Sequence, residues 1–195
     1  MIPKPQTMTT LMREWNYRGE QILSANDVLT LPADHFPYVV FSANLFKDLG
    51  RRIRRQRRWW ANHAMVMTRP GFVETQGVMF RRVPVRSYFG SSLMKFVHPE
   101  GWTDEQRQAF TDRVEADLAL PWWRRLYDFP AIIGQLTNFQ SIQIPGLEIC
   151  SSRVGLAIAA ADPSFYLRQA SPDQINSWMK DSGNWNVDGY YIPLD

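Results

Sequence analysis

The segment QIPGLEICSSRVGLAIAAA, residues 143–161, contains Cys150, the only cysteine in the chain of 195 residues. The Pro145-Gly146 pair is typical of a turn, and the residues after Cys150 have the apolar spacing of a helix. Three of them share one helix face: Val154, Ile158 and Ala161. This pattern predicts that Cys150 lies at or near the first turn of a helix that follows a loop.

A cysteine at the start of a helix has a distinct chemistry. Unpaired backbone N–H groups and the helix dipole favour a negative charge at that position. A thiol held there is deprotonated more easily and is a better nucleophile at neutral pH. The same N–H groups are able to hold an oxyanion. Cys150 is therefore a candidate nucleophile, and the alternative is a small buried hydrophobic residue.

The composition indicates a globular protein. Hydrophobic residues make up 45% of the chain and charged residues 21%. The length predicts a single domain over residues 1–195, with residues 1–30 as a peripheral N-terminal arm. One cysteine excludes an internal disulfide bond. Because there is no apolar run of about 18 residues and no signal-peptide core, we expect no transmembrane helix and either a cytoplasmic location or delivery by another route.

A cluster of arginines accounts for the local excess of positive charge. The net charge is only +3, yet a predicted helix over residues 43–59 carries Arg51, Arg52, Arg54, Arg55, Arg57 and Arg58, and Trp59-Trp60 follow. Such a patch binds phosphates, and adjacent aromatic rings stack on bases. Contact with nucleic acid, anionic lipid or a protein partner is therefore one interpretation, and a solvated helix face is the other.

Apolar periodicity and turn signals predict an α+β fold with helices packed on an antiparallel sheet. The predicted strands cover residues 29–31, 38–41, 62–68, 72–80, 82–88 and 190–192. Besides 43–59, helices are predicted over 103–118, from Pro121, after Cys150 and from Ser171, with a shorter apolar segment at 131–136. The hairpin that turns at Pro70-Gly71 is expected at the centre of the sheet.

A cysteine nucleophile needs a base, and usually a third group that orients the base. The chain has three histidines. His35 and His98 lie near prolines in apparent loops, where ordinary surface residues are common. His63 opens a predicted strand on the same face as Met65 and Met67, where a structural histidine is the alternative to a base.

The predicted hairpin register bears on the orienting group. A two-residue loop at Pro70-Gly71 pairs Arg69 with Phe72, Met67 with Glu74, Met65 with Gln76 and His63 with Val78. Glu74 and Gln76 then share a face with His63, and Gln76 lies nearer. A bulge or a strong twist is needed to bring Glu74 to the imidazole. The alternative is that Glu74 and Gln76 are ordinary solvent-exposed strand residues that do not contact His63.

Three short motifs resemble a known family. They are Asn62-His63-Ala64-Met65-Val66-Met67, then Gly71-Phe72-Val73-Glu74-Thr75-Gln76-Gly77-Val78, and finally Ile149-Cys150-Ser151-Ser152. In this order they are similar to the circularly permuted, papain-like branch of the NlpC-type cysteine peptidases and amidases, in which the histidine precedes the cysteine. The chain departs from that family in two respects. The family often has Cys-Ser-Glu at the nucleophile, whereas here Arg153 follows Ser151-Ser152. The arginine-rich helix is also unusual for the family. The similarity extends over about residues 36 to 180.

The resemblance implies a permuted papain-like fold with Cys150 as nucleophile, His63 as base and Glu74 as the group that orients His63. The implied function is a thiol-dependent hydrolase that cleaves an amide bond, with cell-wall peptide (peptidoglycan) as the default substrate. A lipid acyl transferase or thioesterase on the same fold is an alternative. No cofactor or metal is expected, because no Cys and His ligand cluster is evident. The competing hypothesis is a non-catalytic binding module that uses the arginine-rich helix.

Overall fold

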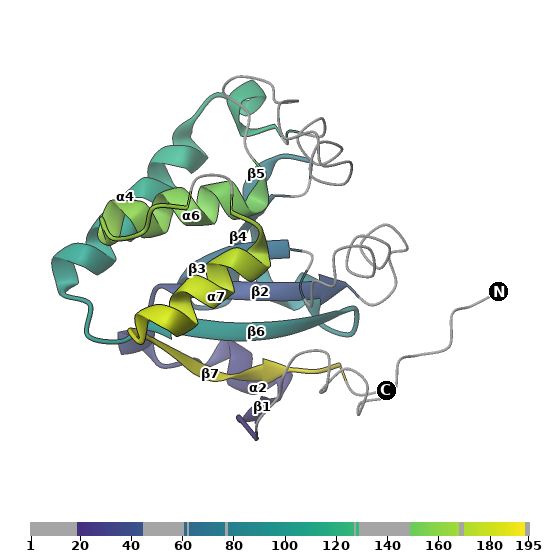
Figure 1. Cartoon of the computed structure of the whole chain (residues 1–195). Helices are drawn as coiled ribbons and strands as arrows, with labels where there is room; N and C mark the ends of the chain where they lie inside the picture. The colour runs from purple at the N-terminus through teal and green to yellow at the C-terminus, as the bar shows by residue number, and fades with distance from the viewer. Residues whose placement is uncertain are drawn as a thin grey trace.

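The computed structural model describes residues 19–44, 61, 63–76, 78–126, 128, 149–167 and 170–193. Seven strands form one sheet in the order β1-β7-β6-β2-β3-β4-β5 (Figure 1). Their bounds are β1 Ile22–Leu23, β2 Tyr38–Asn44, β3 His63–Arg69, β4 Phe72–Gln76, β5 Phe80–Pro84, β6 Ser92–Pro99 and β7 Trp185–Tyr191. β1 is parallel to β7, and the other neighbouring pairs are antiparallel.

The described helices pack on both faces of this sheet. They are α2 (Ala25–Leu29), α4 (Asp104–Ala119), α6 (Cys150–Ala161) and α7 (Pro172–Ser182). Short 3-10 turns occupy Ala33–His35, Val85–Tyr88 and Trp122–Arg125. In Figure 1, α4, α6 and α7 lie on one side of the sheet, and α6 contacts both α4 and β3. Among the described residues, no helix combines the length and the apolar character needed to cross a bilayer.

Two apolar cores follow from the alternation of side chains along the strands. The core shared with α4, α6 and α7 includes Val39, Phe41, Val66, Phe110, Val114, Ile158 and Ile175. The core on the opposite face, shared with α2, includes Val28, Val40, Met65, Met67 and Phe96. Because successive side chains of a strand point to opposite faces, β2 and β3 each contribute to both cores. The predicted α+β class with a mainly antiparallel sheet is therefore confirmed.

The predicted helix starts agree with the structure where the sequence carries a capping box. Thr103 and Gln106 bond reciprocally at the start of α4, and Ser171 and Gln174 do so at α7. α6 also begins where predicted, at Cys150 itself. Its N-cap residue is the apolar Ile149, which contributes no side-chain hydrogen bond.

Several predicted elements differ from the structure. The strand over residues 29–31 is wrong, because a capping box between Ser24 and Asp27 starts α2, which ends at Leu29. β6 was not predicted; all of its residues are buried, so its sequence shows no apolar and polar alternation. The β3–β4 hairpin is not central, because β6, β7 and β1 extend the sheet beyond β2 on the other side.

The predicted N-terminal arm is only partly peripheral. Leu23 and Val28 are buried, so residues 22–29 belong to the folded body. Residues 1–18 lie outside the described chain. The arginine cluster at 51–58 and the apolar segment at 131–136 also lie outside it, and residues 43 and 44 of the predicted 43–59 helix belong to β2.

Candidate active site

A β-bulge in the β3–β4 hairpin determines which residues meet His63. Arg69 pairs with Phe72, as the sequence predicts, but Glu74 pairs with Val66 and not with Met67. The register therefore shifts by one residue between these two pairs. Such a shift exchanges the faces of all subsequent side chains. Glu74 consequently shares the helix-covered face with Val66, and Thr75 shares the face of His63.

Thr75 is the polar partner of His63. The His63 Nε2 atom is hydrogen-bonded to the Thr75 Oγ1 atom. The Tyr88 hydroxyl donates a second hydrogen bond to the same oxygen at 3.0 Å. Thr75 is 5% exposed, so this chain of hydroxyl groups is shielded from solvent. Three segments thereby converge on one point: the start of β3, the end of β4 and the 3-10 turn after β5.

Cys150 lies at the start of the helix that packs on β3. Its side chain is buried, with 6% of the residue exposed. The first backbone bond of the helix runs from the Arg153 N–H group to the Ile149 carbonyl at 3.3 Å, so the preceding N–H groups are not part of the helical ladder. These groups give the thiol the electrostatic setting expected at a helix N-terminus.

Electrostatics connects Cys150 with the hydroxyl chain. Burial raises the pKa of Tyr88; the hydrogen bond to Thr75 opposes this shift, and a negative charge on Cys150 adds to it. The Cys150 sulfur is therefore within electrostatic reach of the Tyr88 hydroxyl. Tyr88 is thus related to Cys150 through this charge effect and to His63 through Thr75, while the parity of β3 places the His63 side chain on the face opposite the one that α6 covers.

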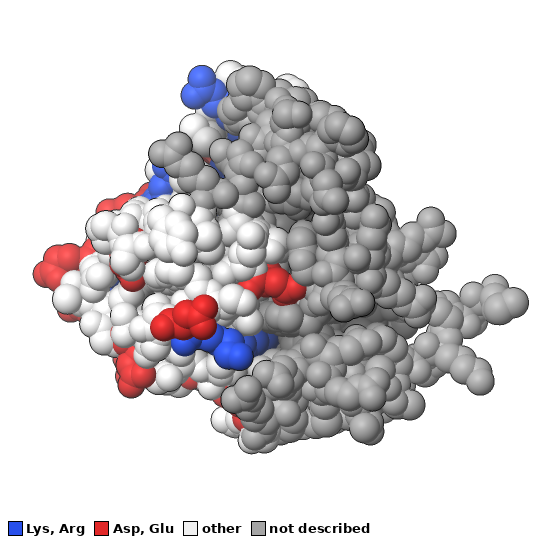
Figure 2. All heavy atoms as spheres, viewed as in Figure 1, with Lys and Arg blue, Asp and Glu red and all other residues white. Residues whose placement is uncertain are grey.

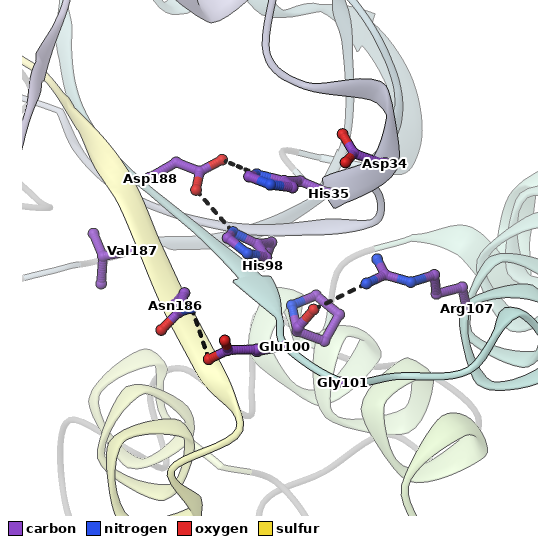
Figure 3. A pocket seen from close by; sticks show the side chains of 10 residues that line it. Asp34, His35, His98, Glu100, Gly101, Arg107, Asn186, Val187 and Asp188 are labelled. Atoms are coloured by element: carbon purple, nitrogen blue, oxygen red, sulfur yellow. Dashed lines mark hydrogen bonds and ion pairs between the residues drawn. The ribbon is translucent and has the colours of Figure 1, made fainter.

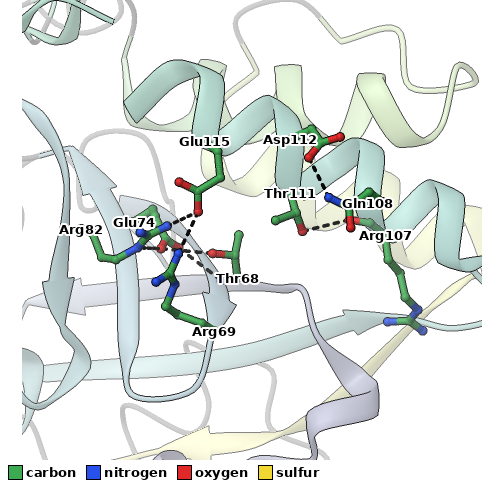
Figure 4. A network of polar contacts seen from close by, with 9 residues as sticks. All are labelled: Thr68, Arg69, Glu74, Arg82, Arg107, Gln108, Thr111, Asp112 and Glu115. Carbon is green, nitrogen blue, oxygen red and sulfur yellow. Dashed lines mark hydrogen bonds and ion pairs between the residues drawn. The ribbon is translucent and has the colours of Figure 1, made fainter. Parts of the chain in front are cut away.

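Glu74 is engaged elsewhere and does not orient His63. Its side chain is fully buried, and its carboxylate accepts hydrogen bonds from the Arg82 Nε atom at 2.5 Å and from the Thr68 N–H and hydroxyl groups, each at 3.2 Å. Burial raises the pKa of Glu74, and these contacts oppose the shift. Arg82 also pairs with Glu115, so the network joins the hairpin to α4 (Figure 4). The Gln76 side chain lies outside the described residues.

Arg153, where this chain departs from the family motif, has a structural environment. It is 3% exposed, and its guanidinium donates to the Arg124 carbonyl at 2.8 Å. It lies 3.4 Å from the Asp117 carboxylate and 5.1 Å from the centre of the Phe80 ring. Arg153 therefore ties α6 to α4, β5 and the turn before the gap in the described chain.

A second polar cluster was missed by the sequence analysis. His35 and His98 stack with ring centres 4.0 Å apart, and their Nδ1 atoms lie 2.8 Å and 2.9 Å from the two oxygens of Asp188 (Figure 3). The Tyr38 hydroxyl also donates to Asp188. His35 and His98 were interpreted as surface residues, but His98 is buried. His35 and Asp188 are 153 positions apart, so no local motif signals their contact.

Charge on the visible surface is mixed. In the face shown in Figure 2, acidic and basic side chains of the described residues lie interspersed. The arginine cluster at 51–58 lies outside those residues, so the predicted polyanion surface stays a prediction.

No protein-family model matches the chain, and no curated protein matches it. The similarity to the permuted NlpC-type enzymes therefore depends on the short motifs around His63, Glu74 and Cys150.

Proposed function

We propose that the protein is a thiol-dependent hydrolase of amide bonds, an amidase or peptidase on a permuted papain-like fold. Cys150 is the nucleophile and His63 is the base. What supports this proposal is the position of the buried Cys150 at the first residue of α6, together with the hydrogen bonds that link His63 through Thr75 to Tyr88.

Thr75 replaces Glu74 as the proposed orienting group. Because Tyr88 donates to the Thr75 oxygen, that oxygen has a second lone pair available for the Nε2–H group of His63. Nδ1 is then the unprotonated ring nitrogen, and it accepts the thiol proton. A hydroxyl orients the imidazole in this way without placing a charge beside it.

The chemical steps follow from these roles. His63 takes the proton of Cys150, and the thiolate attacks the substrate carbonyl. Backbone N–H groups at the start of α6 stabilise the tetrahedral oxyanion. The amine departs with the proton held by His63 and leaves a thioester on Cys150. Water, deprotonated by His63, then attacks the thioester, which releases the acid and returns the proton to the thiol.

The resemblance supplies the substrate class, which is a peptide amide such as that of a cell-wall peptide. A lipid acyl transferase or thioesterase would use the same thioester and differ in the acyl acceptor or the bond cleaved. The non-catalytic alternative depends on the arginine cluster at 51–58 and does not require a reactive thiol.

A burst experiment tests the proposal without knowledge of the natural substrate. The full chain is mixed with p-nitrophenyl acetate, and the release of p-nitrophenolate is followed by stopped flow. We expect a burst of about one equivalent per chain, because the acyl-enzyme forms faster than it is hydrolysed. Cys150→Ser should abolish the burst, and His63→Gln should slow it.

His98→Gln is the matched control, because it alters a histidine of the second cluster and should leave the burst intact. A wild-type chain without a burst, or a burst that survives in Cys150→Ser, would contradict the proposal. Alkylation of Cys150 by iodoacetamide only after unfolding would favour the binding-module alternative.

A further inference from the structure

The cluster of His35, His98 and Asp188 joins three distant parts of the chain. His35 ends the 3-10 turn Ala33–His35, His98 lies near the end of β6, and Asp188 lies in β7. One ligand atom from each residue can be chosen so that all three lie within 4.8 Å of one another. Their side chains project toward one another from these elements (Figure 3).

The contact between His98 and Asp188 is close but poorly directed. The Nδ1 atom of His98 lies 2.9 Å from Oδ1 of Asp188, a distance that suits a hydrogen bond. Nevertheless, within the part of the chain that the structure describes, this buried nitrogen has no hydrogen-bond partner of acceptable geometry. The two atoms are therefore in close contact without a well-directed hydrogen bond. An ion bound by both atoms would satisfy this buried nitrogen.

The surroundings of the cluster favour a cation and admit one from solvent. A pocket of about 510 Å³ is lined by His35, His98 and Asp188 together with the acidic residues Asp34 and Glu100. Arg107 also lines it, but its guanidinium donates to the Phe36 carbonyl at 2.6 Å and the Pro99 carbonyl at 3.1 Å. These carbonyls hold the guanidinium in place.

We propose that His35, His98 and Asp188 bind a divalent transition-metal cation of the zinc class. Two imidazole nitrogens and one carboxylate oxygen are ligands that Zn²⁺ prefers, and solvent in the pocket supplies the fourth. In a tetrahedral site the ligand atoms lie about 3.4 Å apart, so on binding the contacts to Asp188 open by roughly half an ångström. The two stacked rings, whose planes differ by 17°, also turn so that both Nδ1 lone pairs face the ion. Coordination through Nδ1 requires that each ring carry its proton on Nε2.

The hydroxyl of Tyr38 completes the arrangement around the proposed ligands. It donates to the Asp188 oxygen that also contacts His35. Such outer contacts fix the orientation of a ligating carboxylate. The bound ion would fasten the 3-10 turn before β2 to the β6–β7 pair. This site is separate from the Cys150 and His63 neighbourhood and does not depend on the proposed hydrolase function.

The test uses the full chain after treatment with EDTA. It is titrated with Co²⁺, whose visible absorption reports the coordination geometry, and then with Zn²⁺ in competition. We expect about one ion per chain, a visible absorption band that Zn²⁺ abolishes, and a higher melting temperature with Zn²⁺. His35→Gln, His98→Gln and Asp188→Asn should each weaken binding by at least about ten-fold.

Two controls keep the result interpretable. The first control is a pair of variants, Cys150→Ser and His63→Gln, which remove a thiol and an imidazole that could bind Co²⁺ elsewhere. Each variant should bind Co²⁺ with the same affinity as the wild type. His35 has 34% of its side chain exposed, so His35→Gln tests the site with little risk to folding, and circular dichroism checks the buried variants. Absence of binding at millimolar Co²⁺, or binding that is lost in Cys150→Ser and kept in His35→Gln, would overturn the proposal.

Discussion

The two histidine clusters differ in the kind of group that holds the imidazole. At the candidate active site His63 bonds to a hydroxyl, Thr75, which accepts a further hydrogen bond from Tyr88. At the second cluster His35 and His98 share the carboxylate of Asp188. A hydroxyl fixes the orientation of a ring and contributes no charge, whereas the half-buried carboxylate of Asp188 brings a negative charge that favours positive charge nearby. The first arrangement suits proton transfer from a thiol, and the second suits cation binding.

The bulge in the β3–β4 hairpin explains why the first cluster contains no carboxylate. Glu74 is adjacent to Thr75 in sequence, but the shifted register directs it to the opposite face, toward Arg82 and α4. One additional residue in a strand therefore separates a structural ion pair from a candidate catalytic group. The following predictions test this separation.

The largest effect is expected at Asp188. Its carboxylate accepts contacts from His35, His98 and Tyr38, and Asp188→Asn removes the charge while it keeps the shape. We expect the free energy of unfolding to fall by about 3 kcal/mol, measured by urea denaturation of the metal-free chain. Asp34→Asn, an exposed change in the same pocket, is the control and should stay within about 0.5 kcal/mol of the wild type. Equal losses in both variants would show that Asp188 has no special role.

Glu74→Gln should reduce stability without affecting the thiol. The change leaves Arg82 with Glu115 as a remaining partner but weakens the buried charged hydrogen bonds. We expect a loss of about 2 kcal/mol in the free energy of unfolding and an unchanged rate of alkylation of Cys150 by iodoacetamide. A slower alkylation with unchanged stability would return Glu74 to the role that the sequence suggested.

The two clusters should also separate in thiol chemistry. Cys150 is expected to react with iodoacetamide near pH 6–7 faster than free cysteine does, and His63→Ala should slow this reaction by roughly ten-fold. His98→Gln, in the other cluster, should not change it. The rates are measured by mass spectrometry of the folded chain under pseudo-first-order conditions. Equal effects of the two variants would mean that His63 acts through stability alone.

Local sequence signals predicted the parts of the fold that depend on neighbouring residues. The Pro70-Gly71 turn, the capping boxes at Thr103 and Ser171 and the start of α6 at Cys150 all follow from residues within one turn or hairpin. The helix predicted from Pro121 is wrong in kind: Pro121 precedes a 3-10 turn over Trp122–Arg125, and no longer helix is described there. These signals are reliable because the hydrogen bonds that they encode are local.

Features that depend on distant contacts were not predictable. β6 is buried on both faces, so its sequence lacks the apolar and polar alternation that marks a strand with one solvent-exposed face. The register shift in the hairpin has no glycine or proline within β3 to signal it. The partnership of His98 with Asp188 exists only because β6 pairs with β7, an arrangement that no short motif encodes. Thr75 follows Glu74, the residue of the family motif. It could not be identified from the sequence as the partner of His63, because that contact depends on the register shift.

The smallest effect, and the most specific, is expected at Thr75. Thr75→Val keeps the branched shape that suits a strand and removes the hydroxyl that holds the His63 ring. Because this hydroxyl orients the base and does not touch the substrate, we expect iodoacetamide alkylation of Cys150 to slow by only about three-fold, a smaller change than in His63→Ala. The pH profile of alkylation should shift to higher pH, which a purely structural change would not produce. Thr75→Ser keeps the hydroxyl and is the matched control; it should restore both the rate and the profile. If Thr75→Ser behaved like Thr75→Val, the side-chain methyl and not the hydroxyl would be responsible, and His63 would require a different orienting group.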